Sequence, residues 1–335
     1  MKNILITGGA GFIGLNFLKL ILKYKFNIIN IDNLSYASNK EVKQIKDKNY
    51  FFYNINIKDK KKISYIFTKH NIDTVINFAA ESHVDNSIKK PNDFINTNIL
   101  GTHNLLNCAY RYWFKQPFKI KKKFKKKCLF LQVSTDEVYG SIKFGSFSEK
   151  SNLSPNSPYS ASKASADLIV NSYNKTFGVP TIITRCTNNY GPYQHSEKFI
   201  PTIIKALLNK KKIPIYGKGK NIREWIYVED HCLGILKVIK NGKIGQTYNI
   251  GSGKEVNNLD LVNIIIKLFI SKHKDYNYFS LIKFVKDRPG HDYRYSLNSK
   301  KINKIGWKCK YTFNKSLIKT IEFYEKSISK KFKKI

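Results

Sequence analysis

The stretch ITGGAGFIG, residues 6–14, decides the fold that we expect for this chain. The apolar run KNILIT leads into it, and the helix-forming run GLNFLKLILKY follows it. Gly8, Gly11 and Gly14 therefore lie between a strand and a helix, in a G-x-x-G-x-x-G pattern. Glycine lets the backbone turn tightly here and approach a pyrophosphate, which binds at the positive N-terminus of the helix. The stretch thus predicts a dinucleotide-binding site.

Three further apolar runs alternate with longer amphipathic segments in the first half of the chain. FNIINID (26–32), DTVINFA (73–79) and CLFLQVST (128–135) are apolar without strict alternation, which is typical of strands buried on both faces. Amphipathic segments such as NTNILGTHNLLNCAYRYW separate them. Strand and helix in alternation predict an α/β fold with a Rossmann-type doubly wound parallel sheet.

The regular alternation ends near residue 185, after which loops rich in Gly, Pro, aromatic and charged residues become frequent. Loops of this composition commonly build a binding surface on a rigid scaffold. The later stretch GQTYNIGSG has the pattern of another strand, so we expect the chain to return to the sheet. The predicted division is a dinucleotide-binding domain over 1–185 with 226–253, and a smaller interleaved C-terminal substrate-binding domain over 186–225 and 254–335.

The chain carries a high positive charge, because 60 Lys and Arg residues against 23 Asp and Glu residues leave a net charge of +37. Such a field favours polyanions, so a polyanion-binding protein is one hypothesis for the function. However, the lysines are scattered along the whole length. We therefore expect a compositional bias with no specific nucleic-acid partner, and we expect the basic run KQPFKIKKKFKKK (115–127) to be a solvated surface loop.

The cysteines and the apolar runs indicate a compartment. The chain has five widely spaced cysteines and no C-x-x-C pair, which is typical of reduced thiols rather than of disulfides or a metal site. No run of the sequence approaches the roughly 18 apolar residues of a membrane span. We expect a cytoplasmic protein with no bound metal and no membrane partner.

Asp32 ends the second predicted strand, 18 residues past Gly14. A carboxylate at this place accepts hydrogen bonds from the adenosine ribose and repels a 2′-phosphate. The sequence therefore favours NAD over NADP as the cofactor.

The stretch LQVSTDEVYG (131–140) places hydroxyls and two adjacent acids at the end of another predicted strand. Since side chains alternate along a strand, Asp136 and Glu137 cannot point the same way while the chain stays extended. One interpretation is an ordinary charged turn. The other is that the strand delivers two carboxylates to the rim of a pocket, where each can carry a proton.

Tyr159 and Lys163, in the stretch YSASK, are four residues apart and so lie on one face of a helix. A lysine ammonium near a phenol favours the phenolate, which makes the tyrosine a usable base near neutral pH. The Y-x-x-x-K spacing alone is weak evidence, because it begins at five other tyrosines of this chain. Tyr159 differs from them because small residues surround it and the acid-bearing strand lies just upstream.

The glycine loop, Thr135, Tyr159 and Lys163 together resemble the extended short-chain dehydrogenase/reductases that act on nucleotide sugars. Within that family, five motifs are similar to the nucleotide-sugar dehydratases of the dTDP-glucose 4,6-dehydratase group: AAESHVDNSI, STDEVYG, NNYGPYQHSEKFIP, NIREWIYVEDH and DRPGHDYRYSLN. The likeness runs in register from about residue 2 to Trp307. It implies NAD as cofactor, dTDP-glucose as substrate and a role in deoxysugar biosynthesis.

The resemblance also implies a reaction and a role for each residue of the site. Tyr159 takes the proton from the sugar 4-hydroxyl, while NAD accepts a hydride from carbon 4 and later returns it to carbon 6. Glu137 removes the proton on carbon 5, and Asp136 protonates the departing hydroxyl on carbon 6. Thr135 hydrogen-bonds the 4-oxygen, and Lys163 binds the nicotinamide ribose and tunes Tyr159. Asp136 must be protonated to act, which an apolar site and a neighbouring anion promote.

Further residues line the two ligand sites by the same resemblance. Those expected at NAD are Gly8, Gly11, Phe12, Ile13, Gly14, Asp32, Asn33, Leu34, Ser35, Asn56, Ile57, Ala79, Ala80, Thr97, Tyr159, Lys163 and Asn189. Those expected at the nucleotide sugar are Ser82, Thr135, Asn188, Glu197, Lys198, Phe199, Tyr216, Arg223, Asn258, Arg288 and His291. The two arginines suit a diphosphate because guanidinium groups offer forked donors, whereas His291 could equally be a structural loop residue.

Asn56 departs from the family, which usually has an aspartate that accepts a hydrogen bond from the adenine amino group. An amide oxygen accepts less strongly than a carboxylate. We therefore expect a modestly weaker hold on NAD.

Two alternatives stay open. Sugar 4-epimerases and UDP-glucuronate decarboxylases share the glycine loop and the tyrosine pair but usually lack the Asp-Glu doublet, since an epimerase has no leaving hydroxyl to protonate. Another dehydratase, epimerase or decarboxylase acting on a UDP-sugar is the first alternative, because the thymine preference rests on resemblance alone. The polyanion-binding protein is the second.

The family usually forms homodimers through paired helices. We expect a homodimer through residues 98–113 and 160–177, whose apolar faces are compatible with it. The same faces could also pack within one chain.

Overall fold

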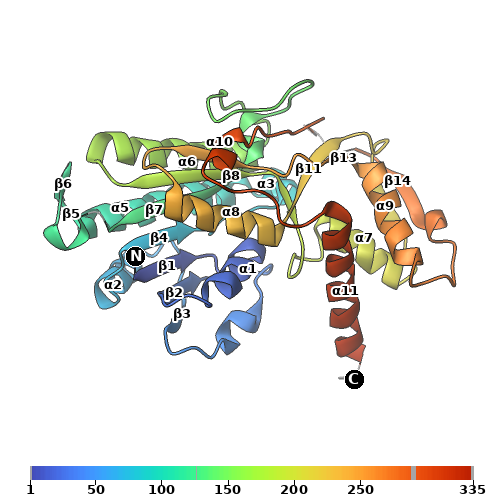
Figure 1. The fold of residues 1–335 in the computed structure, drawn as a ribbon, viewed down its shortest axis with the longest axis horizontal. Coiled ribbons are helices and arrows are strands. Elements are labelled where there is room, and N and C mark those ends of the chain that lie inside the picture. Colours follow the sequence, from blue (N-terminus) through green and yellow to red (C-terminus); the bar gives the residue numbers. More distant parts are fainter. Residues whose placement is uncertain (1, 126, 288–291, 333–335) are drawn as a thin grey trace.

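The computed structural model describes residues 2–125, 127–287 and 292–332. It contains a seven-stranded sheet in which every neighbouring pair of strands is parallel (Figure 1). In spatial order the strands are β12 (Thr247–Ile250), β8 (Thr181–Cys186), β7 (Leu129–Thr135), β4 (Thr74–Asn77), β1 (Asn3–Thr7), β2 (Asn27–Asp32) and β3 (Tyr50–Asn54). The strand order reverses between β1 and β4, as in a doubly wound sheet. The predicted Rossmann fold is therefore confirmed.

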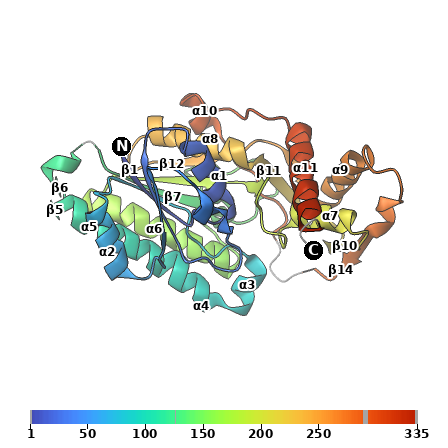
Figure 2. The same ribbon diagram turned by 90° about the horizontal axis from the view of Figure 1, so that it is seen from below.

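Helices cover both faces of this sheet, because alternate strand residues point to opposite sides. They are α1 (Phe12–Ile21), α8 (Val228–Asn241) and α10 (Lys300–Lys304) on one face, and α2 (Lys60–Lys69), α5 (Thr102–Trp113) and α6 (Pro158–Phe177) on the other (Figure 2). In β1, Ile4 and Ile6 pack in the buried cluster of α1 and α8. Leu5, between them, packs in the cluster of α2 and α5. The strands of the four predicted apolar runs, β1, β2, β4 and β7, are buried along almost their whole length, as expected of strands covered on both faces.

A smaller region beside the sheet is built from segments that are far apart in the sequence. One of its sheets has the order β13 (Glu255–Asn257), β11 (Ile222–Tyr227) and β9 (Asn188–Tyr190), and a second pairs β10 (Ile213–Tyr216) with β14 (Ile282–Val285). Helices α7 (Phe199–Leu208), α9 (Asn258–Ile270) and α11 (Phe313–Phe332) pack with these strands around a buried cluster of their own (Figure 1). The stretch GQTYNIGSG supplies β12 of the large sheet, which confirms the strand expected there. The domain boundaries stay a prediction.

Parts of the chain differ from the expectation, among them strand β8 of the large sheet, which is buried along its whole length but is not one of the predicted runs. Strand β3 is not among the strands that the sequence predicts, because its residues are only half-buried at the sheet edge. The basic run 115–127, expected to be a solvated loop, contributes to a hairpin of β5 (Phe114–Gln116) and β6 (Lys119–Ile120). Phe124, just beyond the hairpin, is 3% exposed and packs in the α2–α5 cluster, so an apolar side chain anchors this basic run to the core.

The remaining helical segments are η1 (Lys40–Gln44), α3 (Val84–Lys89), α4 (Pro91–Phe94), the π-helix η2 (Ile95–Gly101), η3 (Lys122–Phe124), η4 (Asp136–Tyr139) and η5 (Tyr278–Leu281).

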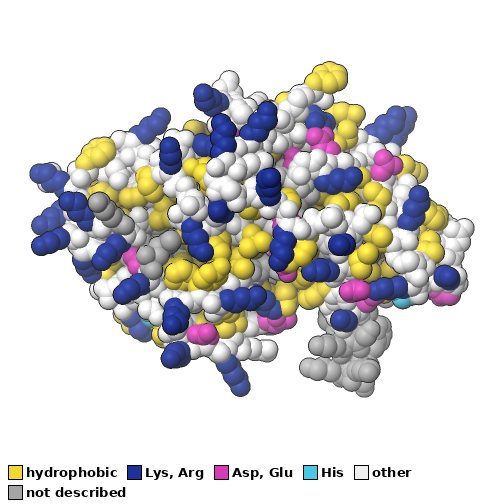
Figure 3. All heavy atoms as spheres, viewed as in Figure 1, with side chains coloured by type: hydrophobic (Ala, Val, Ile, Leu, Met, Phe, Trp, Pro, Cys, Tyr) yellow, Lys and Arg dark blue, Asp and Glu magenta, His cyan; other side chains and the backbone are white. Residues whose placement is uncertain are grey.

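Basic side chains are spread over the surface with apolar and uncharged groups between them, on the face that Figure 3 shows. This distribution agrees with a compositional origin for the charge of +37. Over the described ranges, no helix combines the length and the apolar character that crossing a bilayer requires.

Candidate active site

Three pockets adjoin one another at the carboxyl ends of the parallel strands, where α/β sheets bind their ligands. The glycine-loop pocket is lined by the turn after β1 and by residues after β2 and β4. The central pocket is lined by the ends of β7 and β8 and by the start of α6. The outer pocket is lined by residues of the smaller region together with residues 82–85 and Glu137. Ser82, Gln194 and Lys198 line all three, so the pockets form one continuous groove.

The glycine loop has no room for side chains. Gly8 has a φ of +69°, and a Cβ at this residue would lie 2.6 Å from the backbone nitrogen of Ala79. A Cβ on Gly14 would lie 2.3 Å from the carbonyl oxygen of Gly8. Helix α1 starts after Gly11, and no side chain of the described residues caps its N-terminus. The first N–H groups of α1 can therefore bind an anion that the loop lets approach.

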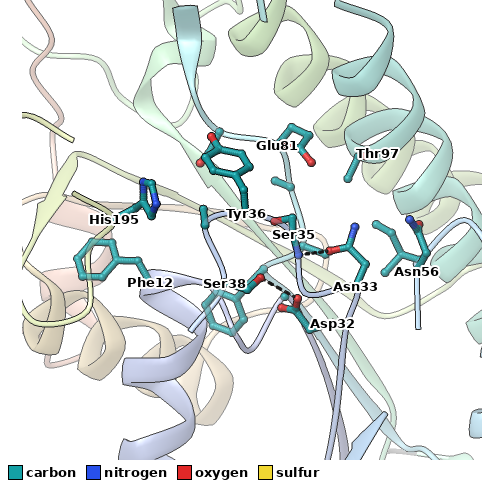
Figure 4. A pocket seen from close by; sticks show the side chains of 18 of the residues that line it. Phe12, Asp32, Asn33, Ser35, Tyr36, Ser38, Asn56, Glu81, Thr97 and His195 are labelled. Carbon is teal, nitrogen blue, oxygen red and sulfur yellow. Dashed lines mark hydrogen bonds between the residues drawn. The ribbon is translucent and has the colours of Figure 1, made fainter. Parts of the chain in front are cut away.

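Asp32, at the end of β2, lines the same pocket next to the glycine loop, and Figure 4 shows it beside Ser38. Its carboxylate accepts hydrogen bonds from Ala10 N at 2.9 Å, Leu34 N at 2.8 Å and Ser38 Oγ at 3.2 Å. Burial raises the pKa of Asp32, and these hydrogen bonds oppose the rise. A carboxylate offers about four acceptor sites. Asp32 therefore holds the following loop in place and can still accept a hydrogen bond from a ribose hydroxyl.

The other residues expected at the dinucleotide lie in two adjoining pockets, with one exception. Phe12, Asn33, Ser35, Asn56, Ile57, Ala79, Ala80 and Thr97 line the glycine-loop pocket, and Ile13, Gly14 and Asn189 line the central pocket. Leu34 is the exception: it lines neither pocket but has a φ of 54° and packs against the α1 cluster. The glycine cradle, the open helix N-terminus and the buried acid together fit a dinucleotide.

The chain after β7 brings the adjacent acids into one pocket. The strand ends at Thr135, and Asp136–Tyr139 form the 3₁₀ turn η4, whose cap is the Thr135 Oγ1 that accepts a hydrogen bond from Glu137 N at 3.3 Å. The turn ends the strand alternation, so Asp136 and Glu137 both line the central pocket together with Thr135. Glu137 also lines the outer pocket. The geometry thus favours two delivered carboxylates over an ordinary charged turn.

Asp136 is 2% exposed and has anionic neighbours. Its Oδ1 accepts a hydrogen bond from Thr135 Oγ1 at 3.1 Å, whereas Oδ2 has no hydrogen-bond partner in the described part of the chain. Burial raises the pKa of Asp136 well above its usual range, and the charges of Glu137 and Glu224 raise it further. Asp136 can therefore hold a proton at a pH where an ordinary aspartate has lost it.

The start of α6 is defined by its sequence. Ser157 and Ser160 form a capping box, in which each side chain accepts a hydrogen bond from the backbone N–H of the other. Further along, Asn98 Nδ2 of the π-helix donates to Ser162 Oγ at 2.8 Å, and Ser162 Oγ donates to the carbonyl of Tyr159 at 2.7 Å. These contacts hold the first turn of α6, and with it Tyr159, against the central pocket.

Tyr159 and Lys163 are both buried in this pocket, but their electrostatics differ from the expectation. Lys163 Nζ donates to the carbonyl of Val133 at 2.7 Å, and burial lowers the pKa of Lys163. Burial raises the pKa of Tyr159 well above its usual range, and the charge of Glu137 adds to the rise. The expected lowering of the Tyr159 pKa is therefore wrong for this pocket, because burial of the phenol and the charge of Glu137 raise it.

The outer pocket collects most of the residues expected at the nucleotide sugar. Its lining includes Ser82, Asn188, Glu197, Lys198, Phe199, Tyr216, Arg223 and Asn258. Arg288 and His291 lie outside the described residues. Arg223 donates to the carbonyls of Asp292 at 2.9 Å and Tyr293 at 3.2 Å, and its guanidinium lies 4.4 Å from the ring centroid of Tyr295. It thus fastens this segment to β11 as well as lining the pocket.

The structure also brings residues to the groove that the sequence reasoning did not single out. Cys186 ends β8 inside the central pocket, and burial raises its pKa to about 12, so it is a neutral thiol there. Its place at the carboxyl end of a strand is a signal that could have found it. Tyr36 and His195 line the glycine-loop pocket, and no local pattern marks either of them. Within the described ranges, no three His, Cys, Asp or Glu residues come together as metal ligands.

Comparison with known proteins identifies the family of this chain. The family described as GDP-mannose 4,6 dehydratase matches residues 5–320. The dTDP-glucose 4,6-dehydratase 1 of Escherichia coli K12 is 44% identical over 338 residues, which cover 96% of this chain and 92% of that protein. A crystal structure of a dTDP-glucose 4,6-dehydratase from Streptomyces venezuelae with NAD bound is 39% identical, with a TM-score of 0.89 and 98% of both chains covered. A UDP-glucose 4-epimerase from Thermotoga maritima, crystallised with UDP-glucose, has a TM-score of 0.85 at 26% identity and covers 97% of this chain and 99% of its own.

Proposed function

Because this chain belongs to the GDP-mannose 4,6 dehydratase family, and a protein 44% identical to it is a dTDP-glucose 4,6-dehydratase, we infer that it has that activity. It is an NAD-dependent carbon-oxygen lyase that converts dTDP-glucose to dTDP-4-keto-6-deoxyglucose and water. The reaction oxidises carbon 4, eliminates water across carbons 5 and 6, and reduces carbon 6. NAD, when bound, supplies a cationic ring that accepts the hydride and gives it back, so no external reductant is consumed.

The glycine-loop pocket is the proposed NAD site. The N-terminus of α1 takes the pyrophosphate, because its first N–H groups face the glycine loop. Asp32 accepts a hydrogen bond from an adenosine ribose hydroxyl, and Asn56 accepts one from the adenine amino group. Lys163, an ammonium held by the carbonyl of Val133 at 2.7 Å, binds the nicotinamide ribose in the central pocket.

The side chains of the central pocket divide the proton transfers between them. Tyr159 would take the proton of the 4-hydroxyl as a phenolate, which the charges of Lys163 and of a bound NAD ring would favour against the burial that raises its pKa, and Thr135 hydrogen-bonds the 4-oxygen. The 4-ketone acidifies the proton on carbon 5, which Glu137 removes. Asp136 then gives its proton to the hydroxyl that leaves carbon 6. The raised pKa of Asp136 supports its role as the acid, because an acid must still hold its proton when the leaving group departs.

The observation that carries this proposal is the pair Asp136 and Glu137 lining one pocket together with Tyr159. The fold alone does not discriminate, since a UDP-glucose 4-epimerase shares it at a TM-score of 0.85. An epimerase breaks no carbon-oxygen bond and has no use for a buried acid beside a half-buried base. The doublet therefore supports dehydration over epimerisation.

Deuterium at carbon 4 of dTDP-glucose tests the reaction in one experiment. The purified protein is incubated with the labelled substrate without added reductant, and the product is followed by mass spectrometry and NMR. We expect a 4-keto-6-deoxy product with the label on carbon 6. A protein with bound NAD that leaves dTDP-glucose unchanged, but converts UDP-glucose in the parallel reaction, would contradict the substrate assignment.

We extend the proposal to a homodimer. Helices α5 and α6 pack against each other within one chain, yet Leu100 in the π-helix η2 before α5 and Leu168 in α6 are 51% and 59% exposed. Burying these leucines against a second copy is favourable. Leu168→Lys should convert the dimer to a monomer in light scattering.

The proposed location is the cytoplasm, and the proposed division of the chain follows the predicted boundaries. All five cysteines are free, and four of them are buried, which suits a reducing compartment. Residues 1–185 with 226–253 would bind NAD, and 186–225 with 254–335 would bind the sugar nucleotide.

A further inference from the structure

Three segments from distant parts of the chain meet at the rim of the glycine-loop pocket, and Tyr36 joins them. Tyr36 follows β2, and its side chain is 57% exposed. Its hydroxyl donates to Glu197 Oε1 at 2.8 Å and accepts from Asn86 Nδ2 of α3 at 3.0 Å. Two hydrogen bonds on one exposed hydroxyl fix the ring where an exposed side chain would otherwise rotate freely.

The supports on both sides of this contact are themselves anchored. On the side of Tyr36, the backbone N–H of Asn39 donates to the carbonyl of Ala10 in the glycine loop at 2.7 Å. On the side of Glu197, the hydroxyl of Tyr324 in α11 donates to the carbonyl of Gln194 at 2.6 Å. The hydrogen bond therefore connects two fixed loops, one on the large sheet and one on the smaller region.

Glu197 also stands between the two ligand sites, because it lines both the glycine-loop pocket and the outer pocket. His195 Nδ1 lies 3.4 Å from Glu197 Oε1, and its ring meets the Tyr36 ring edge-on with centroids 5.4 Å apart. Figure 4 shows the Tyr36 ring between His195 and Glu81, at the rim of the pocket. A dinucleotide in this pocket is thus enclosed by Tyr36 and the loop that carries Glu197.

We propose that Tyr36 is a positioning residue that acts through Glu197. Its hydrogen bond closes the rim over the bound NAD and, at the same time, orients the wall that Glu197 shares with the nucleotide-sugar site. The inference rests on the proposed function, since it takes NAD and the sugar nucleotide as the occupants of these pockets. A cofactor that each turnover regenerates has no need to leave, so a contact that must open before NAD dissociates serves the reaction.

Tyr36→Phe tests this inference, because it removes the hydroxyl and keeps the ring and its contact with His195. Losing one hydrogen bond to a carboxylate near the surface should speed NAD dissociation about fivefold and raise the KM for dTDP-glucose by about the same factor. The kcat at saturating substrate should not change. NAD dissociation is measured on the holoenzyme by exchange of the bound cofactor against isotopically labelled NAD. Tyr24→Phe, at another exposed tyrosine, is the matched control and should change neither quantity.

A double-mutant cycle with Glu197→Ala shows whether Tyr36 acts through this one partner. In that case, NAD leaves the double variant no faster than it leaves Glu197→Ala alone. Fully additive effects, an unchanged dissociation rate in Tyr36→Phe, or a change confined to the melting temperature would each overturn the proposal. Wild-type protein that retains NAD but does not convert dTDP-glucose would contradict the proposed function instead, and the exchange measurement would still decide the role of Tyr36.

Discussion

Replacing Asp136 by asparagine removes the proposed acid with little disturbance of the fold. The residue is 2% exposed, and the two side chains have nearly the same volume, so the change creates neither a cavity nor a clash. The amide oxygen can still accept the hydrogen bond that Thr135 Oγ1 donates at 3.1 Å. However, an amide cannot give a proton to the hydroxyl that leaves carbon 6. A general acid contributes roughly 10²–10⁴-fold, so dehydration should slow by that factor, or by about 2.7–5.5 kcal/mol of barrier.

The oxidation of carbon 4 should survive in Asp136→Asn, because Tyr159 and Lys163 are unaltered. The absorbance of reduced cofactor should therefore build up after rapid mixing with dTDP-glucose, while formation of the 4-keto-6-deoxy product lags. Asp47→Asn, at an exposed aspartate far along the sequence, is the control and should behave as wild type. Product formation at the wild-type rate in Asp136→Asn would refute the assignment of the acid.

The same substitution should change how stability depends on pH. Burial, then the charges of Glu137 and Glu224, raise the pKa of Asp136 above its ordinary value of 3.8. Once the pH exceeds the ordinary value, the unfolded chain gives up this proton more readily than the folded chain does. Wild-type stability therefore falls with rising pH until the raised pKa is passed. Asp136→Asn has no such titration and should gain stability relative to wild type across that window, from about pH 4 upward. Urea unfolding that shows a pH-independent difference would refute the electrostatic reasoning.

Three other substitutions have defined outcomes. Gly14→Ala places a methyl group 2.3 Å from a loop carbonyl oxygen, so the purified protein should retain about tenfold less NAD on extraction. Asp167→Asn leaves the buried guanidinium of Arg185, now 2.9 Å away, without its counter-charge, and urea unfolding should show a loss of about 3–5 kcal/mol. Asp275→Asn, at an exposed ion pair, is its control and should change little. Asn56→Asp should tighten NAD binding about threefold in calorimetry, because a carboxylate accepts more strongly than an amide; an unaltered affinity would count against the adenine contact.

The parts of the fold that could be predicted from the sequence are those with a local cause. Four of the predicted strands are continuous apolar runs, and such runs are buried wherever the sheet is covered on both faces. Strand β3 was not predicted, because YFFYN lies at the edge of the sheet and is half-buried. Which of its side chains are buried depends on the parts of the chain that cover it. The anchoring of the basic run was not predicted for a related reason, since Phe124, just beyond the hairpin, is buried only in the packed chain despite its lysine-rich surroundings.

The sequence predicted which residues form the site, but not how their side chains are arranged or how burial changes their pKa values. Sequence alone could not choose between a charged turn and two delivered acids, because the choice depends on the strand ending at Thr135. The pKa of Tyr159 was assigned the wrong direction, since spacing gives the distance to a lysine but not the burial of the phenol. The contact of Tyr36 with Glu197 joins residues 161 positions apart, and no pattern in a single sequence reports such a pair.

The order in which the strands are made has a consequence for synthesis. Strand β8 ends at Cys186, and its neighbour β12 begins only at Thr247, after the chain has passed through part of the smaller region. At roughly 5–20 residues per second, a growing chain presents the unpaired edge of β8 for about 3–12 s. An open edge of a fully buried strand is a template for pairing with other chains. A gene cut after codon 185 should therefore yield a fragment that aggregates. The predicted dinucleotide-binding domain should be obtained as a separate protein only when residues 226–253, which contain β12, are joined to residues 1–185.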